Sequence, residues 1–166
     1  MFFSIVNLKN RIDMENLVVG MGEALWDILP EGKKIGGAPA NFAYHVSQFG
    51  LPSCVASAVG ADTFGKELLG NFTSKGLNHL IPEVPYPTGT VQVEIDPAGI
   101  PQYEIKENVA WDNIPYTPQL HALAQKTKAV CFGSLAQRNV VSRETINRFL
   151  DAMPRTADRW RIFDIN

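Results

Sequence analysis

The chain has 166 residues, of which 45% are apolar, and its fifteen Lys and Arg against seventeen Asp and Glu give a formal net charge of −2. This length suits a single domain with its own core, and the composition is typical of a globular protein rather than a disordered or fibrous one. The sequence has neither a basic stripe that could follow a phosphate backbone nor an apolar run long enough for a bilayer, so neither a nucleic acid nor a membrane is expected as a partner.

The amino terminus and the cysteines indicate a cytoplasmic protein. Residues 1–13 begin with a short apolar run, but this run is too brief for a secretion signal and no small-residue cleavage pattern follows it. Because Met14 stands just before the first strand pattern, we interpret residues 1–13 as a disordered or mis-annotated leader and residues 14–166 as the domain. Cys54 and Cys131 lie in apolar stretches, where the reduced thiols of cytosolic proteins are typically buried.

The first half of the chain alternates strand and helix patterns. LVVGMG (residues 17–22) is a short apolar run typical of a buried strand, and residues 24–35 predict a strand and a turn. Apolar residues at helical spacing then predict a helix that starts at Asn41. SCVASAVG (residues 53–60) predicts a second buried strand, and Asp62 is placed to cap the helix that follows.

The second half contains a hairpin and then returns to the same alternation. Residues 86–113 alternate apolar with polar side chains around the turn DPAGIP, which predicts a hairpin with one face in water. Thr117 opens a helix, KAVCFG (residues 128–133) predicts a strand, Ser142 caps another helix, and WRIFDIN (residues 160–166) predicts a last strand. We therefore expect an α/β fold with a mostly parallel sheet, helices on both of its faces, and the hairpin as an insertion.

Such a sheet predicts where a ligand would bind. Open α/β sheets bind ligands beyond the carboxyl ends of their strands, so the residues directly after VVGMG, AVCFG and IFDI are candidates. The last of these strands would leave the sheet with an open edge, and pairing between two copies through that edge or through the hairpin would give a homodimer.

A dinucleotide site after the first strand is not supported. Gly20 and Gly22 follow that strand, but the third glycine of the dinucleotide fingerprint is missing. Residues 24–35 also predict a strand and a turn where the fingerprint requires a helix.

A second group of residues suits a ligand rich in hydroxyls. Such a ligand needs acceptors for hydroxyl protons and groups that both donate and accept, which a carboxylate and a carboxamide provide. Asp27 and Asn41 are such a pair, and Gly36 and Gly37 would let the main chain approach a ligand without a Cβ clash. The alternative interpretation of these residues is structural: Asn41 would cap its helix, Asp27 would be a solvated turn residue, and the glycines would form turns.

The spacing of these residues adds a family resemblance. GGAPANFA (residues 36–43), followed by Gly50 and Gly60, resembles the amino-terminal signature of the ribokinase-like (PfkB) carbohydrate kinases. VVGMGEALWD, TGTVQVEID and QYEIKENVAWDNI are similar to the family's first strand and lid strands, and FGSLA and FDIN to later strand ends. The resemblance extends from Leu17 to Asn166 and is closest to fructokinases.

This resemblance implies a three-layer fold with a small lid made of strands. The lid strands are expected at about residues 24–35 and 86–112. The match is to the amino-terminal half of the family only, so the resemblance also implies that the chain is truncated after about half of the family fold.

The resemblance assigns roles to three residues of the motif. It implies that Asp27, Gly37 and Asn41 hold sugar hydroxyls. Gly36 joins them as a candidate because, without a Cβ, it would let the main chain lie against the sugar ring. These residues would form the sugar-binding site.

Four more positions are implied by the resemblance. Gln92 and Tyr103, on the lid strands, would touch or cover the sugar, although both also suit an ordinary hairpin face. Asp164 and Asn166 are similar to a D-x-N motif that lies near the phosphate-transfer region in fructokinases.

The implied activity is ATP-dependent phosphorylation of a primary hydroxyl of a small sugar. The family's catalytic Gly-Ala-Gly-Asp segment does not occur in this sequence, and Gly60-Ala61-Asp62 lies too early to replace it. We therefore expect ATP and Mg²⁺ to serve the complete enzyme, with no catalytic residue, no metal site and no tight cofactor binding in this chain. The alternative hypothesis is a truncated, non-catalytic half-protein that binds sugar or dimerises.

Overall fold

The structure is a computed structural model that describes residues 16–95 and 101–165, so the predicted leader at residues 1–13 and the candidate Asn166 lie outside it. The strands are β1 (Leu17–Met21), β2 (Leu25–Leu29), β3 (Gly32–Gly36), β4 (Ser53–Ala56), β5 (Val59–Gly60), β6 (Asn78–Leu80), β7 (Glu83–Val84), β8 (Thr90–Ile95), β9 (Pro101–Ile105), β10 (Thr127–Gly133) and β11 (Trp160–Asp164). The α-helices are α1 (Ala38–Gln48), α2 (Thr63–Ser74), α3 (Pro118–Lys126) and α4 (Val140–Ala152).

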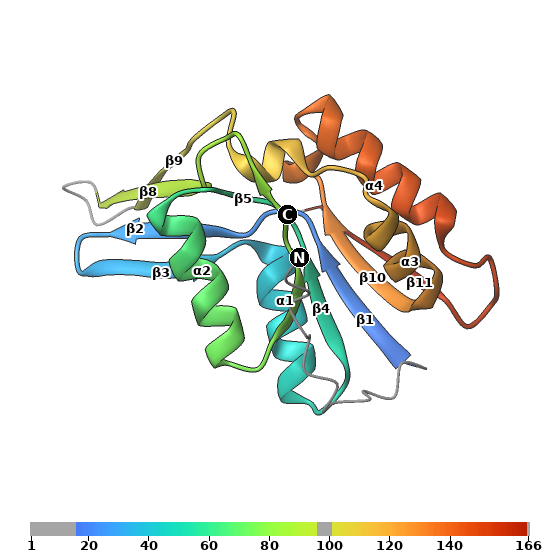
Figure 1. The fold of residues 1–166 in the computed structure, drawn as a ribbon. Coiled ribbons are helices and arrows are strands. Elements are labelled where there is room, and N and C mark those ends of the chain that lie inside the picture. The colour runs from blue at the N-terminus through green and yellow to red at the C-terminus, as the bar shows by residue number, and fades with distance from the viewer. Residues whose placement is uncertain (1–15, 96–100, 166) are drawn as a thin grey trace, which may run out of the picture.

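The central sheet confirms the predicted fold class. Its five strands run parallel in the order β11-β10-β1-β4-β6 (Figure 1). Helices α3 and α4 pack on one face of this sheet, and α1 and α2 pack on the other. Strand β1 is central: β4 and β6, which follow it in the chain, lie on one side of it, and the later strands β10 and β11 lie on the other.

A second sheet forms the predicted lid. Its strand order is β3-β2-β8-β9, and Figure 1 shows it extending away from the central sheet. The β8–β9 pair is antiparallel, which confirms the predicted hairpin, while β2 and β8 pair in parallel. The predicted strand at residues 53–60 is divided, because β4 belongs to the central sheet and β5 pairs with β7 in a small separate sheet.

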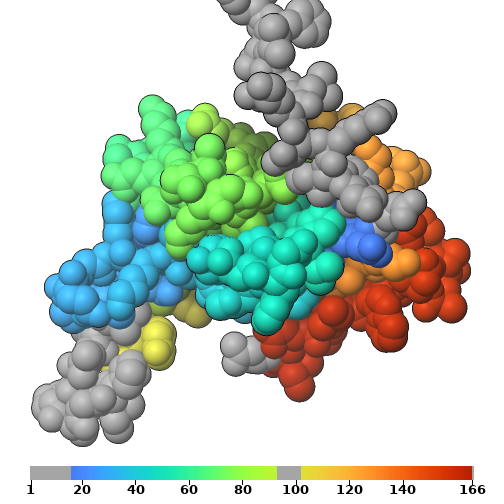
Figure 2. Space-filling view, turned by 90° about the horizontal axis from the view of Figure 1, so that it is seen from below, coloured from blue at the N-terminus to red at the C-terminus, as the bar shows by residue number. Residues whose placement is uncertain are grey.

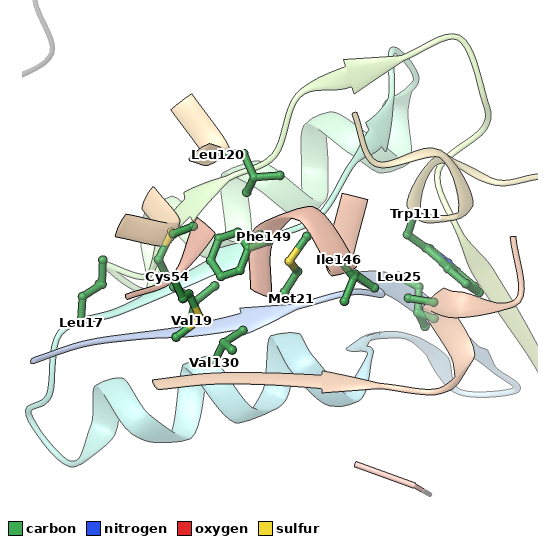
Figure 3. Close-up of a cluster of buried hydrophobic side chains, with 14 of the residues drawn as sticks. Leu17, Val19, Met21, Leu25, Cys54, Trp111, Leu120, Val130, Ile146 and Phe149 are labelled. Carbon is green, nitrogen blue, oxygen red and sulfur yellow. The ribbon is translucent and has the colours of Figure 1, made fainter. Parts of the chain in front are cut away.

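The main core lies between the central sheet and helices α3 and α4 (Figure 3). Because alternate residues of β1 point to the same face, Val19 and Met21 both enter this core, where Phe149 of α4 is fully buried. Trp111, from a 3₁₀ helix at Ala110–Asn113, extends the core toward Leu25 at the base of the lid. The core therefore joins the central sheet to the lid.

Helix α4 begins differently from the sequence prediction. Its N-cap is Asn139, whose side chain accepts a hydrogen bond of 2.9 Å from the backbone N–H of Val141. The predicted cap, Ser142, is wrong: it is buried inside the helix, donates to the carbonyl oxygen of Trp111 and accepts from the backbone N–H of Ile114. A hydroxyl that suits a cap is used here to satisfy buried backbone from another segment.

Candidate functional site

The candidate site lies where the central sheet meets the lid. Strand β1 ends at Met21, and the short link Gly22–Ala24 leads directly into β2 of the lid. No helix follows β1, which agrees with the rejection of a dinucleotide site. Helix α1 begins against this link: a Cβ atom on Gly20 would lie 1.9 Å from the carbonyl oxygen of Pro39. Glycine at this position therefore allows the start of α1 to approach the end of β1.

Asp27 lies on β2 with its carboxylate against Gly36 of the neighbouring strand. A Cβ on Gly36 would come within 2.3 Å of Asp27 Oδ2, so the bare main chain of Gly36 makes room for this carboxylate. Burial raises the pKa of the half-buried Asp27. Within the described part of the chain, no protein group donates a hydrogen bond to the Asp27 side chain. Asp27 is therefore a hydrogen-bond acceptor that the fold shelters without supplying a donor.

Gly37 and Asn41 form the start of α1. The N-cap is Gly37 with a φ of 104°, and Asn41 donates its backbone N–H to the Gly37 carbonyl oxygen at 2.9 Å. The helix thus begins at Ala38, one turn before the predicted start, and the interpretation of Asn41 as the cap is wrong. A Cβ on Gly37 would also lie 2.3 Å from the carbonyl oxygen of Glu23, so conformation and space both require glycine here.

The side chains of Asp27 and Asn41 do not line the same cavity. Asn41 is exposed and lines a cavity of about 450 Å³, whose wall also includes Trp26. Asp27 is not among the residues that line this cavity. Since consecutive residues of a strand point to opposite faces, Asp27 projects to the other face of the lid from Trp26.

The two predicted lid residues also occupy different faces. Gln92 of β8 pairs with Ile28 of β2, and Tyr103 of β9 pairs with Val93 of β8. Val93 is two residues after Val91, the residue of β8 that pairs with Asp27. Following the pairs across the sheet, Tyr103 shares its face with Asp27, whereas Gln92 lies on the opposite face. Both side chains line a small surface hollow at the outer part of the lid.

Sequence reasoning missed a buried carboxyl group at the end of β1. Glu23 is only 4% exposed, and its Oε2 atom has no hydrogen-bond partner among the described residues. Burial raises its pKa, and the negative charge of Asp164 adds to this rise, while backbone hydrogen bonds and Arg138 act in the opposite direction. The position of Glu23 directly after the first strand could have identified it, because ligands in open α/β sheets bind where the strand order reverses, and here the order reverses at β1.

Asp164 lies at the carboxyl end of β11, as predicted. The carbonyl oxygen of Asp164 would lie 3.6 Å from a Cβ on Gly133, and the same Cβ would lie 3.9 Å from Glu23 Oε1. The ends of β1, β10 and β11 are thus close together, and they bring Asp164 near Glu23 at the edge where a ligand was expected.

Asp62 caps α2, as the sequence predicted. Its Oδ1 accepts from the backbone N–H of Gly65 at 2.7 Å, and both of its oxygens accept from Thr88, just before β8. Burial alone would raise the pKa of Asp62, but these hydrogen bonds lower it. Asp62 therefore ties α2 to the first residues of the lid hairpin.

Three further features of the described residues 16–95 and 101–165 concern metal binding, membranes and the cysteines. Within these ranges no cluster of three or more His, Cys, Asp or Glu side chains is arranged to hold a metal ion. None of the helices in the same ranges is long and apolar enough to cross a membrane. Cys54 and Cys131 are both free and buried.

The arrangement defines a ribokinase-like α/β fold with a lid beside the carboxyl ends of its strands. Comparison with known families gives a match to the pfkB family of carbohydrate kinases over residues 30–157. The chain belongs to this family. This confirms the resemblance based on GGAPANFA and the predicted fold class.

Individual relatives agree with this assignment. A protein of Pyrococcus horikoshii that carries the name "putative sugar kinase" is 32% identical over 152 residues, which are 81% of this chain and 49% of that protein. The structure of a P. horikoshii sugar kinase with ATP matches with a TM-score of 0.76 and 28% identity, over 90% of this chain and 53% of that chain. A Vibrio cholerae fructokinase double mutant, solved with fructose, ADP and potassium, shares the fold with a TM-score of 0.71 and 23% identity, over 90% and 50% of the two chains. The chain thus spans about half the length of these proteins.

Proposed function

We propose that this chain is the sugar-binding part of a cytoplasmic, ATP-dependent, fructokinase-like kinase that phosphorylates a primary hydroxyl of a small sugar. The observation that carries the proposal is the Asp27 carboxylate, which is half-buried against Gly36 and lacks a donor among the described residues. A sugar hydroxyl is a donor of the kind that this position lacks. Membership of the pfkB family supports the same substrate class.

Each motif residue has a role in this proposal. Asp27 accepts one or two hydroxyl hydrogens, and the carboxamide of Asn41 donates to one sugar oxygen while it accepts from another. Gly36 and Gly37 keep Cβ atoms out of the space at the start of α1. Because Asp27 and Asn41 lie on different elements, a sugar that both contact would bridge β2 and α1.

The lid and the phosphate region complete the proposed enzyme. Tyr103, which shares the face of Asp27, would contact the sugar from the lid, whereas Gln92 lies on the other face and is given no contact with this sugar. The lid would exclude water, so that ATP phosphorylates the sugar rather than being hydrolysed. Asp164 and Asn166 would lie near the transferred phosphate. In the full-length enzyme, ATP and Mg²⁺ would be held mainly by sequence that corresponds to the remainder of the relatives.

Titration calorimetry with fructose tests the role of Asp27. Removing a charged hydrogen-bond acceptor is expected to weaken binding by about tenfold or more in Asp27→Ala. Asp151→Ala, an exposed carboxylate on α4, is the matched control and should bind fructose like the unaltered chain. Equal affinity of Asp27→Ala and the unaltered chain would remove the assigned role. Absence of binding to fructose, ribose and glucose by the unaltered chain would overturn the sugar site itself.

A second candidate function is a dimer formed by this chain on its own. The observation that favours it is the edge strand β11, where Trp160, Ile162 and Phe163 are exposed large apolar residues. Exposed edge strands are ready to pair with another chain. Sedimentation analysis would show a dimer that Ile162→Lys dissociates, and a stable monomer of the unaltered chain would exclude this candidate.

A further inference from the structure

The cavity beside α1 has walls from three elements. Its volume is about 450 Å³, within the range of pockets that hold small molecules. The β2–β3 hairpin, α1 and the end of α2 surround it, and Figure 2 shows these elements next to one another on one face of the molecule. Asp27 does not line this cavity, although Asn41 and Lys34, the residue paired with Asp27 across β2 and β3, both do.

Positive charge collects around this cavity. Lys33, Lys34 and Lys75 line it together with His45, and none of the residues known to line it is a carboxylate. Lys33 forms an ion pair with Glu67, and Lys34 forms one with Glu31, in which Lys34 Nζ lies 3.4 Å from Glu31 Oε1.

Lys75 differs from the other two lysines. Its Nζ lies 4.8 Å from the ring centroid of Tyr44, and within the described part of the chain no carboxylate pairs with it. The Lys75 charge is thus held beside the cavity by an aromatic ring and is left for an anion to neutralise.

The remaining wall suits a small polar ring. Trp26 donates its indole N–H to the carbonyl oxygen of Phe64 at 2.9 Å, which fixes the indole in the wall of the cavity. Asn71 donates its amide to the carbonyl oxygen of Glu67, and this leaves Asn71 Oδ1 as an acceptor for a hydroxyl group. An apolar floor with a few polar groups is typical of small-molecule pockets.

We propose that this cavity binds a small phosphorylated sugar, with its phosphate against Lys75 and Lys34 and its hydroxyl groups toward Asn71. The lysines supply charge for the phosphate, and the aromatic wall receives the carbon face of the sugar. The cavity excludes Asp27 but includes Asn41, so this second site adjoins the proposed sugar site at the start of α1, and the Lys75 contact does not depend on Asp27.

Calorimetry with fructose 6-phosphate at low ionic strength tests the site. Lys75→Gln is expected to weaken binding by about tenfold, because it removes a charge-assisted contact. Lys66→Gln, an exposed position on α2 outside the cavity, is the matched control and should leave the affinity unchanged. Binding should also weaken as salt is raised, since salt screens the attraction between the lysines and the phosphate. Equal losses in both variants, or none in Lys75→Gln, would overturn the proposal.

Two other probes identify the class of ligand. Inorganic phosphate and AMP should each bind more weakly than fructose 6-phosphate, because neither presents the sugar hydroxyls to Asn71 in the same way. If either bound as tightly and with the same dependence on Lys75, the assignment to a phosphorylated sugar would be wrong.

The two sites can be told apart by crossing the variants. Asp27→Ala should lose fructose binding and keep fructose 6-phosphate binding in the cavity, and Lys75→Gln should do the reverse. Loss of fructose 6-phosphate binding in Asp27→Ala to the same extent as in Lys75→Gln would merge the two sites into one and refute a separate cavity site.

Discussion

The central sheet and the lid sheet are built differently, although the chain passes directly from one to the other. All five residues of β1 are buried, because helices cover both faces of the central sheet. In the lid, β2 changes from buried at Leu25 and Trp26 to half-buried at Leu29, and β3 is mostly exposed. Burial therefore falls along the lid with distance from the core.

This gradient explains where the candidate chemistry lies. In the central sheet, β1 carries only apolar side chains and glycine, so this strand itself offers no carboxyl group to a ligand. Within the described part of the chain, two carboxyl groups at the junction are sheltered: the Asp27 side chain has no protein donor, and Oε2 of Glu23 has no hydrogen-bond partner. The difference between the two sheets thus places the ligand-binding groups at their boundary.

The largest expected effect comes from a core residue of the central sheet. Phe149 is fully buried, so Phe149→Ala should lower the free energy of unfolding by about 3–5 kcal/mol, measured by urea titration. Phe49, which is 84% exposed just after α1, provides the control, and Phe49→Ala should change stability by less than about 0.5 kcal/mol. Similar losses in both variants would contradict the burial that distinguishes the central sheet.

The next effect concerns the link between the two sheets. Asp62→Ala should lower the free energy of unfolding by about 2–3 kcal/mol, because it removes the cap of α2 and the bonds to Thr88 at the start of the lid. Because hydrogen bonds lower the pKa of Asp62, its contribution is present above the ordinary value of 3.8 and is lost as the pH falls through the lowered value.

Asp151→Ala serves as the control for this prediction, since Asp151 is an exposed carboxylate on α4 with a single ion pair to Arg155. Urea titrations at pH 7 and at acid pH should show that the difference between the Asp62 and Asp151 variants shrinks in acid. A constant difference would mean that the charge of Asp62 contributes nothing.

Local sequence patterns predicted the motif and its elements well. The glycines before the helix and the cap at Asp62 depend on residues close together in the chain, and the parallel sheet follows from the alternation of strand and helix patterns; the structure confirms all three. The prediction failed where a distant segment decides the outcome. Ser142 suits a cap locally, but the buried backbone of Trp111 and Ile114 recruits its hydroxyl instead.

The candidate site shows the same limit. Alternation along β2 places Trp26 and Asp27 on opposite faces of the lid, but the sequence does not reveal which of these two residues shares a cavity with Asn41 of α1. Glu23 was missed for a similar reason, since its burial and the nearby charge of Asp164 come from the far end of the chain. Residue types and spacing identify a family motif, whereas three-dimensional neighbours decide which polar groups are left without partners.

A smaller effect on stability is expected at the junction of the two sheets, where the buried Glu23 should make the free energy of unfolding depend on pH. Because burial raises the pKa of Glu23, the folded state holds this proton more tightly than the unfolded state. Stability should therefore fall as the pH rises from the ordinary value of 4.5 through the raised value. In Glu23→Gln this loss should disappear, as measured by urea titrations between pH 4 and pH 8.

Glu144→Gln, an exposed position on α4, is the control and should keep the pH dependence of the unaltered chain. If Glu23→Gln kept it as well, another group would be responsible, and the buried carboxyl at the junction would not be the feature that sets this region apart.

The smallest effect on stability is expected at the outer part of the lid. Tyr103 is 66% exposed, so Tyr103→Ser should change the free energy of unfolding by less than about 0.5 kcal/mol. Because Tyr103 shares the face of Asp27, the same variant should weaken fructose binding several-fold in calorimetry, while Tyr86→Ser, at an exposed position outside the lid sheet, should not. A stability loss above 1 kcal/mol would show that the tip of the lid is packed like its base, and the gradient that places the ligand-binding groups at the junction would then be wrong.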